Sequence, residues 1–212
     1  IPPQLGRDDE IVVSDDNPAG KTRAAVEFYS AYDGRVRYVE GTGEGVCRNF
    51  ENAILNCSGD VIFLCDQDDV WLPNKVERVM KAIENGADVV LHDAMMTDGE
   101  LNVTDESFFS LNGSNGGLTP TDESFFSLNG SKRGFVRNFL KNSYMGCCMA
   151  FRRDFEPAFM PFPKDLAMHD WWIGLNAELK GKVEFIYEPL IKHRCHGGNV
   201  TGGKTTAAQK IS

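Results

Sequence analysis

Short apolar runs alternate with stretches of helical spacing over the first ninety residues of the chain. The clearest run, Val-Ile-Phe-Leu-Cys at 61–65, is continuous and therefore typical of a strand buried on both faces of a parallel sheet. Helical spacing follows at 73–85, with Pro73 in the first turn and Gly86 after the last. We predict strands at 10–14, 36–40, 60–65 and 87–91, and helices at 21–32, 45–56 and 73–85. This alternation predicts a doubly wound α/β sheet, which binds ligands at the carboxyl ends of its strands.

An eleven-residue segment occurs twice in the second half of the chain, at 104–114 and again at 121–131. Two copies are too few for a solenoid, so we interpret 104–131 as a duplicated surface-loop segment of a single domain spanning residues 1–212. The small and polar residues 203–212 are expected to form a flexible tail. We predict further helices at 134–142 and 169–181 and further strands at 145–152 and 183–187.

Composition and charge narrow the class of protein. The 212 residues are 42% hydrophobic and 25% charged, as in globular proteins, and no apolar run approaches the ~20 residues of a membrane helix. The formal net charge of −9 argues against a nucleic-acid partner, because nucleic-acid-binding proteins usually present a basic face. An acidic protein that binds a nucleotide must recruit positive charge locally, from a metal ion or from clustered Arg and Lys. The six cysteines contain no CxxC pair, which favours free thiols in a reducing compartment.

Acidic residues follow three of the predicted strands. They are Asp15 and Asp16 after the first strand, Asp66, Asp68 and Asp69 after the third, and Asp93 after the fourth. Because these strand ends should meet at one edge of a parallel sheet, we expect the carboxylates to converge. Carboxylates gathered in one crevice repel each other unless a cation compensates, and Mg²⁺ takes oxygen ligands. In the alternative interpretation Asp69 caps the following helix and the other carboxylates are solvated loop residues.

Several segments together resemble the family 2 glycosyltransferases of GT-A fold. They are Ile-Val-Val-Ser-Asp-Asp at 11–16, Gly-Val-Cys-Arg-Asn-Phe at 45–50, the segment 59–73 around Asp-Gln-Asp-Asp, His-Asp-Trp-Trp at 169–172 and His-Gly-Gly-Asn at 196–199. The second and third are most similar to the rhamnosyltransferase-like branch, which builds bacterial surface polysaccharides. The resemblance implies an α/β fold with a mostly parallel, Rossmann-like sheet flanked by helices. Family members begin with a strand and helix that this sequence lacks.

The resemblance also implies a role for individual residues. The nucleotide-sugar would be bound by Asp16 at the base, Asp15 beside it, Arg48 near the donor, Asp66 at the ribose and Asp93 at the donor sugar or acceptor. Mg²⁺ or Mn²⁺ would be held by Asp68 and His196. Asp170 would be the general base, although its position equally suits an acidic residue that only stabilises the start of a helix.

These roles imply an inverting transfer of a sugar, rhamnose-like or another hexose, from a nucleoside-diphosphate sugar to an acceptor hydroxyl. A metal ion would neutralise the leaving diphosphate and one carboxylate would take the acceptor proton. The acceptor would be a saccharide or lipid-linked saccharide of bacterial surface polysaccharide synthesis, with the enzyme in the cytoplasm or at the inner face of the membrane. Two alternatives stay open: a truncated nucleotide-sugar-binding module without turnover, and a nucleotidyltransferase.

Overall fold

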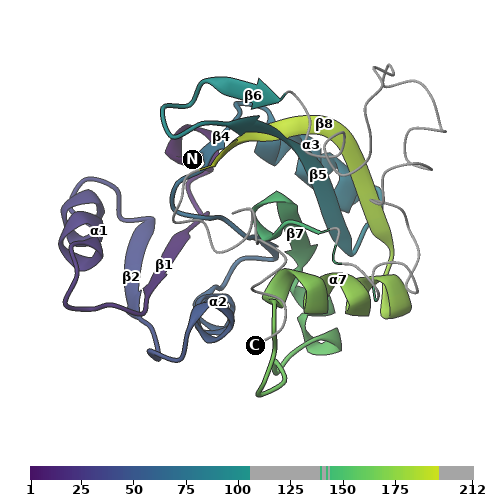
Figure 1. The fold of residues 1–212 in the computed structure, drawn as a ribbon, viewed down its shortest axis with the longest axis horizontal. Coiled ribbons are helices and arrows are strands. Elements are labelled where there is room, and N and C mark those ends of the chain that lie inside the picture. The colour runs from purple at the N-terminus through teal and green to yellow at the C-terminus, as the bar shows by residue number, and fades with distance from the viewer. Residues whose placement is uncertain (106–138, 140–141, 143, 196–212) are drawn as a thin grey trace, which may run out of the picture.

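The computed structural model describes residues 1–105, 139, 142 and 144–195 of the chain (Figure 1). The strands are β1 (Ile11–Asp15), β2 (Val36–Glu40), β3 (Val61–Phe63), β4 (Val70–Trp71), β5 (Val89–Thr97), β6 (Val103–Asp105), β7 (Met149–Arg152) and β8 (Val183–Arg194). The α-helices are α1 (Thr22–Ser30), α2 (Val46–Asn56), α3 (Lys75–Glu84) and α7 (His169–Lys180). Short 3₁₀ helices are η1 (Pro2–Gln4), η2 (Gly146–Cys148) and η3 (Arg153–Ala158).

The main sheet is mixed, so the prediction of a mostly parallel sheet is wrong. Its six strands run in the order β3-β7-β5-β8-β4, with β6 paired to β5. Only β5 and β8 are parallel, and β7 lies antiparallel between β3 and β5. The sequence pattern identified 145–152 as a strand but carried no information about its direction, because side-chain alternation is the same in both orientations.

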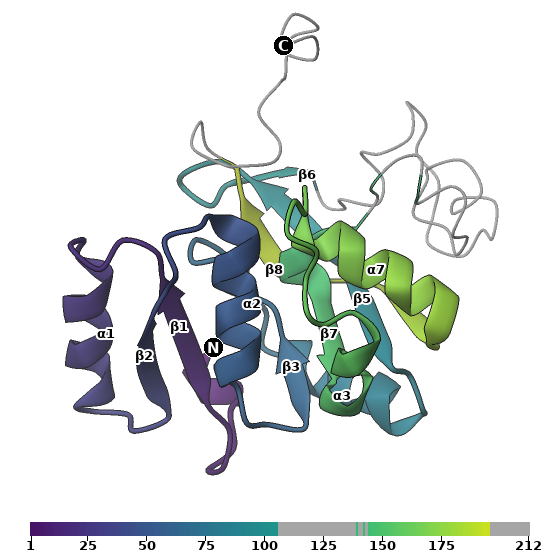
Figure 2. The ribbon, with the colours of Figure 1, turned by 90° about the horizontal axis from the view of Figure 1, so that it is seen from below.

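The first two strands form a parallel pair of their own. The five residues of β1 pair in register with the five of β2, from Ile11 opposite Val36 to Asp15 opposite Glu40. Figure 2 shows this pair beside the larger sheet, on the side where β3 lies. Among the described residues, β1 has a ladder only with β2 and β3 only with β7. The α/β order predicted for residues 10–91 is present with one unpredicted two-residue strand, β4, and its strands belong to two sheets.

The buried strands of the main sheet divide their side chains between two cores. Val89 and Leu91 of β5 join a cluster with Ile54 of α2 and Ile173 of α7, while Val90 between them packs against Val79 of α3. Since successive strand residues point to opposite faces, α3 covers one face of the sheet, and α2 and α7 cover the other (Figure 1). This explains why the strand sequences read as continuous apolar runs.

Two strands are longer than the sequence pattern indicated. Strand β5 continues through His92 and Asp93 to Thr97, and β8 continues past Tyr187 to Arg194. Their parallel pairing extends along β5 from Val89 to Thr97, with irregularities on both sides of Asp93. Both extensions mix polar and apolar residues, and they lead into the candidate site described below.

Other features predicted from the sequence have mixed outcomes. All six cysteines are free thiols, as expected. None of the helices in the described ranges has the length and apolar character needed to span a bilayer. The predicted helix at 134–142, most of the repeat at 104–131 and the tail at 203–212 lie outside the described residues.

The packing of α7 depends on a glycine. A Cβ atom at Gly174 would lie 2.2 Å from Cδ2 of Tyr144, whose hydroxyl donates a 2.7 Å hydrogen bond to Glu178 one turn further along the helix. The buried Tyr144 ring therefore lies across α7 where only hydrogen leaves room. This contact fixes the position of the helix that carries Asp170.

We expect Gly174→Ala to destabilise the chain by about 1–3 kcal/mol, because the added methyl group overpacks a buried contact. The midpoint of urea unfolding measures this change. Gly34→Ala is the matched control, since a Cβ there meets nothing within 4 Å. Equal midpoints for the two variants would contradict the close packing of Tyr144 on α7.

Candidate active site

The loop that follows β3 carries Asp66, Asp68 and Asp69 and is held in place by the end of β8. Strand β4 directly follows this loop and pairs antiparallel with β8, Val70 opposite Lys192. The loop therefore lies against His193 and Arg194. His193 Nδ1 lies 2.8 Å from Asp69 Oδ1, and the Arg194 backbone N–H and Nε donate to Asp69 Oδ1 and the Asp68 carbonyl oxygen.

Asp170 lies in the first turn of α7 and is buried, with 6% of its surface exposed. Its Oδ1 accepts hydrogen bonds from the Trp171 backbone N–H at 2.6 Å and from Asn142 Nδ2 at 3.2 Å. Burial raises the pKa of the Asp170 carboxyl above its usual value, and these hydrogen bonds oppose the rise. These hydrogen bonds thus orient the side chain, which is largely shielded from solvent.

Asp66 connects the loop to α7 through electrostatics. Its pKa is raised to about 6, first by burial and then by the nearby charges of Asp69, Asp68 and Asp170, while His193 lowers it. Asp170 is therefore near the loop although it lies more than one hundred residues away in sequence. Several carboxylates therefore surround the partly buried carboxyl group of Asp66. A cation bound there would stabilise this arrangement, because it would offset the repulsion among the negative charges.

His169 forms the wall behind Asp170. Its ring stacks on Phe50 of α2 with centroids 3.8 Å apart, and neither ring nitrogen has a hydrogen-bond partner among the described residues. Burial lowers the pKa of His169 to about 4, so the ring is neutral at physiological pH. A Cβ on Gly146 would lie 2.8 Å from His169 Nε2, which explains a glycine at that position. His169 packs the start of α7 against α2.

Asp15 and Asp16 lie at the end of β1 and organise the loops of the β1–β2 pair. The two carboxylate oxygens of Asp16 accept hydrogen bonds from the backbone N–H groups of Gly43 and Gly45, each at 3.0 Å. Asp15 Oδ1 accepts a hydrogen bond from the Asn17 backbone N–H at 3.0 Å. Asp15 is the last residue of β1 and Asp16 follows the strand as predicted, but this strand is outside the sheet that leads to Asp66.

Asp93 does not follow the end of a strand, so that prediction is wrong. It lies within β5, is 3% exposed, and accepts a 2.9 Å hydrogen bond from the Ala94 backbone N–H. The pairing of β5 with β8 shifts register on both sides of it. Polar residues at 92 and 93 suggested a strand end, whereas the bulge accommodates them inside the ladder.

Arg48 links α2 to the segment before α7. Its guanidinium pairs with Glu51 and donates to the carbonyl oxygens of Phe162 and Pro163 at 3.2 and 3.0 Å. It also lines a cavity of about 440 Å³ with Thr42, Glu44, Glu51, Asn52, Leu55, Lys164 and Asp165. These contacts explain the structural role of Arg48. Its contact with the nucleotide-sugar stays a prediction.

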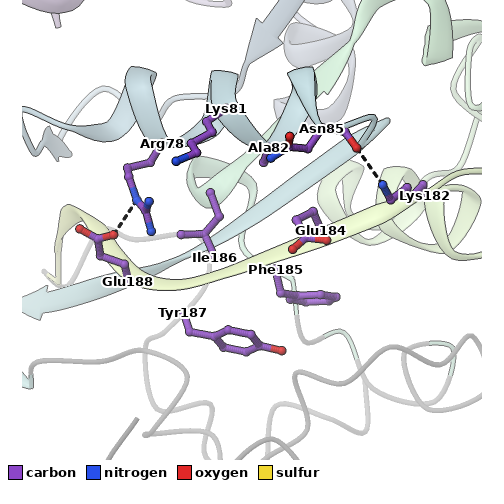
Figure 3. Close-up of a pocket in the computed structure, with 10 residues that line it drawn as sticks. All are labelled: Arg78, Lys81, Ala82, Asn85, Lys182, Glu184, Phe185, Ile186, Tyr187 and Glu188. Carbon is purple, nitrogen blue, oxygen red and sulfur yellow. Dashed lines mark hydrogen bonds and ion pairs between the residues drawn. The ribbon is translucent and has the colours of Figure 1, made fainter. Parts of the chain in front are cut away.

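A second cavity, of about 520 Å³, lies between α3 and β8 and contains none of the site carboxylates (Figure 3). An ion pair of Arg78 with Glu188 at 2.8 Å and a hydrogen bond from Lys182 Nζ to the Asn85 carbonyl oxygen at 3.0 Å cross its walls. Charges of both signs line it, and Arg78 and Glu188 among them form an ion pair. The buried carboxylates, rather than this cavity, identify the candidate site.

The structure also brings together residues that the sequence pattern did not. The ligand atoms of Asp66, Asp69, Cys147 and His193 lie within 4.8 Å of one another. Cys147 was interpreted only as a free thiol, and Asp69 as a helix cap in one alternative. No local pattern could have found this set, because it depends on the pairing of β4 with β8. Of the expected metal residues, Asp68 lies on the same loop and His196 lies outside the described residues.

Comparison with known proteins establishes the family. The sequence model of glycosyl transferase family 2 matches residues 4–157, which is most of the chain. The chain belongs to glycosyl transferase family 2. An uncharacterized glycosyltransferase of Nostoc sp. is 24% identical over 106 residues, covering 49% of this chain and 33% of that protein. An uncharacterized protein of Mycobacterium bovis is 22% identical over 206 residues, covering 95% and 54%.

Solved structures support the same fold for this family 2 chain. S. aureus TarS 1–349 in complex with UDP-GlcNAc superposes with a TM-score of 0.61 at 17% identity, covering 90% of this chain and 50% of that one. The mannosyltransferase PcManGT from Pyrobaculum calidifontis, in complex with GDP-Man and Mn²⁺, gives a TM-score of 0.56 at 17% identity, covering 85% and 45%. The chain is thus an α/β fold similar to these glycosyltransferases. It spans a third to just over half of the length of the four proteins.

The raised pKa of Asp66 predicts a pH-dependent stability. The folded chain retains the Asp66 proton up to about pH 6, whereas an unfolded aspartate loses it near pH ~3.9. Stability from this group is therefore greatest at acidic pH and falls as the pH rises through 6. Asp66→Asn should raise the melting temperature of the metal-free chain, and this gain should grow by a few °C between pH 4 and pH 8.

Thermal melts in the presence of a chelator measure this difference. Asp60→Asn is the control, because it makes the same substitution on an exposed bend. A gain from Asp66→Asn that is equal at pH 4 and pH 8 would show that Asp66 ionises normally.

Proposed function

We propose that this chain is the donor-binding and catalytic part of an inverting glycosyltransferase, which moves a sugar from a nucleoside-diphosphate sugar to an acceptor hydroxyl. The observation that carries the proposal is the placement of Asp170 beside the Asp66–Asp69 loop. Membership of glycosyl transferase family 2 supports it, as does the fold shared with proteins solved with UDP-GlcNAc and with GDP-Man.

The charge of the loop fits a divalent cation, Mg²⁺ or Mn²⁺. Asp66 is charged only at a free-energy cost in its carboxylate-rich surroundings, and a cation would remove that cost. We propose that Asp68 and His196 hold the metal and that Asp66 binds the ribose. A metal held by these residues would supply positive charge to neutralise the leaving diphosphate. The related PcManGT, solved with GDP-Man and Mn²⁺, is consistent with this choice.

Asp170 has the surroundings expected of a general base. A carboxylate in its ionised form at that position can accept the proton of the attacking hydroxyl. The Asn142 amide and the Trp171 backbone N–H hold its Oδ1, which fixes the direction of the carboxylate. One base and one leaving diphosphate suit direct displacement with inversion, and the residues need no covalent intermediate.

Asp15, Asp16, Arg48 and Asp93 complete the proposed donor site. Asp16 lies at a strand end, where it shapes the 41–45 loop that would border the base. Asp93 is buried within β5. Its carboxylate would contact the donor sugar only if the irregular pairing on both sides of it turns the side chain toward the site. The similarity of residues 45–50 and 59–73 to rhamnosyltransferases supports a rhamnose-like donor sugar or another hexose. A saccharide or lipid-linked acceptor would then place the protein in the cytoplasm, at the inner face of the membrane.

The split sheet favours one alternative, a nucleotide-sugar-binding module without turnover. Among the described residues, the facing edges of β1 and β3 lack a backbone partner. We propose that the active protein has a further strand here, which would join the two sheets and complete the base pocket. Comparing sugar transfer by this chain with transfer by a version extended at its N-terminus would separate the enzyme from the module.

Asp68→Asn should weaken Mn²⁺-dependent donor binding by at least about tenfold, because it removes a charged metal ligand. Isothermal titration calorimetry with UDP- and GDP-sugars, with and without Mn²⁺, measures the effect. Binding in the absence of metal serves as the internal control. Unchanged Mn²⁺-dependent affinity would disprove the assignment of Asp68.

Asp170→Asn keeps the shape of the side chain but removes the proton acceptor. The turnover rate should fall by about 10²–10⁴-fold while donor affinity changes little, which marks an interaction made mainly in the transition state. Asp165→Asn, exposed and five residues earlier, is the matched control. Normal turnover by Asp170→Asn would show that Asp170 is not the base and only stabilises the start of α7.

A further inference from the structure

A cluster of metal-ligand type lies beside the proposed donor site and uses other residues than the expected metal pair. It combines Asp66 and Asp69 of the loop with Cys147 of η2 and His193 of β8, and their ligand atoms lie within 4.8 Å of one another. The metal residues implied by the family resemblance are Asp68 and His196. The cluster shares Asp66 with the proposed donor site but contains neither of the two proposed metal ligands, so it requires an explanation of its own.

Asp69 supplies an observation that points to a missing partner. Its side chain is fully buried, with none of its surface exposed. One carboxylate oxygen, Oδ1, faces His193 Nδ1 and the Arg194 backbone N–H, but Oδ2 has no hydrogen-bond partner among the described residues. A buried, unsatisfied carboxylate oxygen costs several times the value of an ordinary hydrogen bond unless something satisfies it. A cation bound to this carboxylate would neutralise its charge and so reduce that cost.

The distances suit a small tetrahedral ion. Cys147 Sγ lies 3.8 Å from His193 Nδ1, and Asp69 Oδ1 lies 2.8 Å from the same nitrogen. A tetrahedral Zn²⁺ with ordinary Zn–S and Zn–N bonds separates sulfur from nitrogen by about 3.6 Å and oxygen from nitrogen by about 3.3 Å. Adjustments of about half an ångström around the imidazole would therefore accommodate the ion.

The chemistry of the set selects the ion. Thiolate and imidazole ligands favour Zn²⁺ over Mg²⁺, which prefers oxygen ligands in octahedral geometry. Two carboxylates, one thiolate and one imidazole make the four ligands of a closed zinc site. We propose that Asp66, Asp69, Cys147 and His193 form a second, thiolate-containing site that binds Zn²⁺ in preference to Mg²⁺.

The position of Cys147 is fixed before any ion binds. Lys75 of α3 is fully buried, donates a 2.9 Å hydrogen bond to the Cys147 carbonyl oxygen and lies over the Trp71 ring, 4.1 Å from its centroid. The strand β8 fixes His193 in the same way, through its pairing with β4 and β5. Ligands supplied by three rigid elements lose little freedom on binding, which favours affinity.

Substitution with Co²⁺ tests the site directly, because a cobalt–thiolate bond gives a charge-transfer band in the near ultraviolet that oxygen and nitrogen ligands do not give. The metal-free 212-residue chain should develop this band when titrated with Co²⁺. Zn²⁺ should then remove it, and a large excess of Mg²⁺ should not. Absence of the band in the unmodified chain would overturn the proposal without reference to any variant.

Variants identify the ligands. Cys147→Ser should abolish the band and weaken Zn²⁺ binding by at least about tenfold. Cys148→Ser, the adjacent buried thiol, and Cys195→Ser, an exposed thiol after β8, should both retain it. Circular dichroism and thermal melts confirm that each variant is folded. A band that survives in Cys147→Ser, or that disappears in Cys195→Ser, would place the thiolate elsewhere and refute the proposed ligand set.

Asp68→Asn separates this proposal from the proposed function. This variant should lose Mn²⁺-dependent donor binding yet retain the cobalt–thiolate band, because Asp68 is outside the cluster. Loss of the band in Asp68→Asn would mean that the two sites are one, and the second site would be refuted even if the transfer activity were confirmed.

Discussion

The buried contact between Asp69 and His193 is the interaction on which the site depends. It ties the loop after β3 to the end of β8, two segments more than one hundred residues apart, with the Asp69 side chain removed from solvent. The surrounding carboxylates raise the pKa of His193, an effect opposed by burial, and so favour its charged form. The short contact between the imidazole and the buried carboxylate holds the loop in one conformation. Asp66 and Asp68 are positioned as a consequence.

The mixed sheet supplies the second requirement, the placement of the proposed base Asp170 near the loop. Strand β7 runs antiparallel through the sheet, and η2 before it brings Gly146 and Cys147 to the loop. Helix α7 then crosses the same face, with His169 packed on Phe50 and Gly174 under Tyr144. Its first turn thereby delivers Asp170 to the carboxylates. The antiparallel strand is thus part of how the site is built.

Charge explains why these residues can work together. The chain has a net charge of −9 and gathers further negative charge in one place, which favours a cation and, through it, a phosphate ligand. The basic side chains of Lys75, His193 and Arg194 lie at this region, with Lys75 bonded to the Cys147 carbonyl oxygen and Arg194 to the Asp68 carbonyl oxygen. Which ion binds then depends on the ligands that it contacts. Oxygen ligands on the loop favour Mg²⁺, whereas the sulfur of Cys147 and the nitrogen of His193 favour Zn²⁺.

The sequence by itself determined the order of strands and helices up to residue 91, the free thiols, the family and the importance of the Asp66–Asp69 loop, because apolar periodicity and local motifs are written in neighbouring residues. The tertiary structure alone decided the direction of β7, the division into two sheets, the burial of Asp93 inside β5 and the meeting of Asp69, Cys147 and His193. Each of these depends on pairing between segments distant in the chain. Side-chain alternation is identical for parallel and antiparallel strands, and a bulge can hide a polar residue within a ladder. Such pairing is fixed only when the whole chain packs.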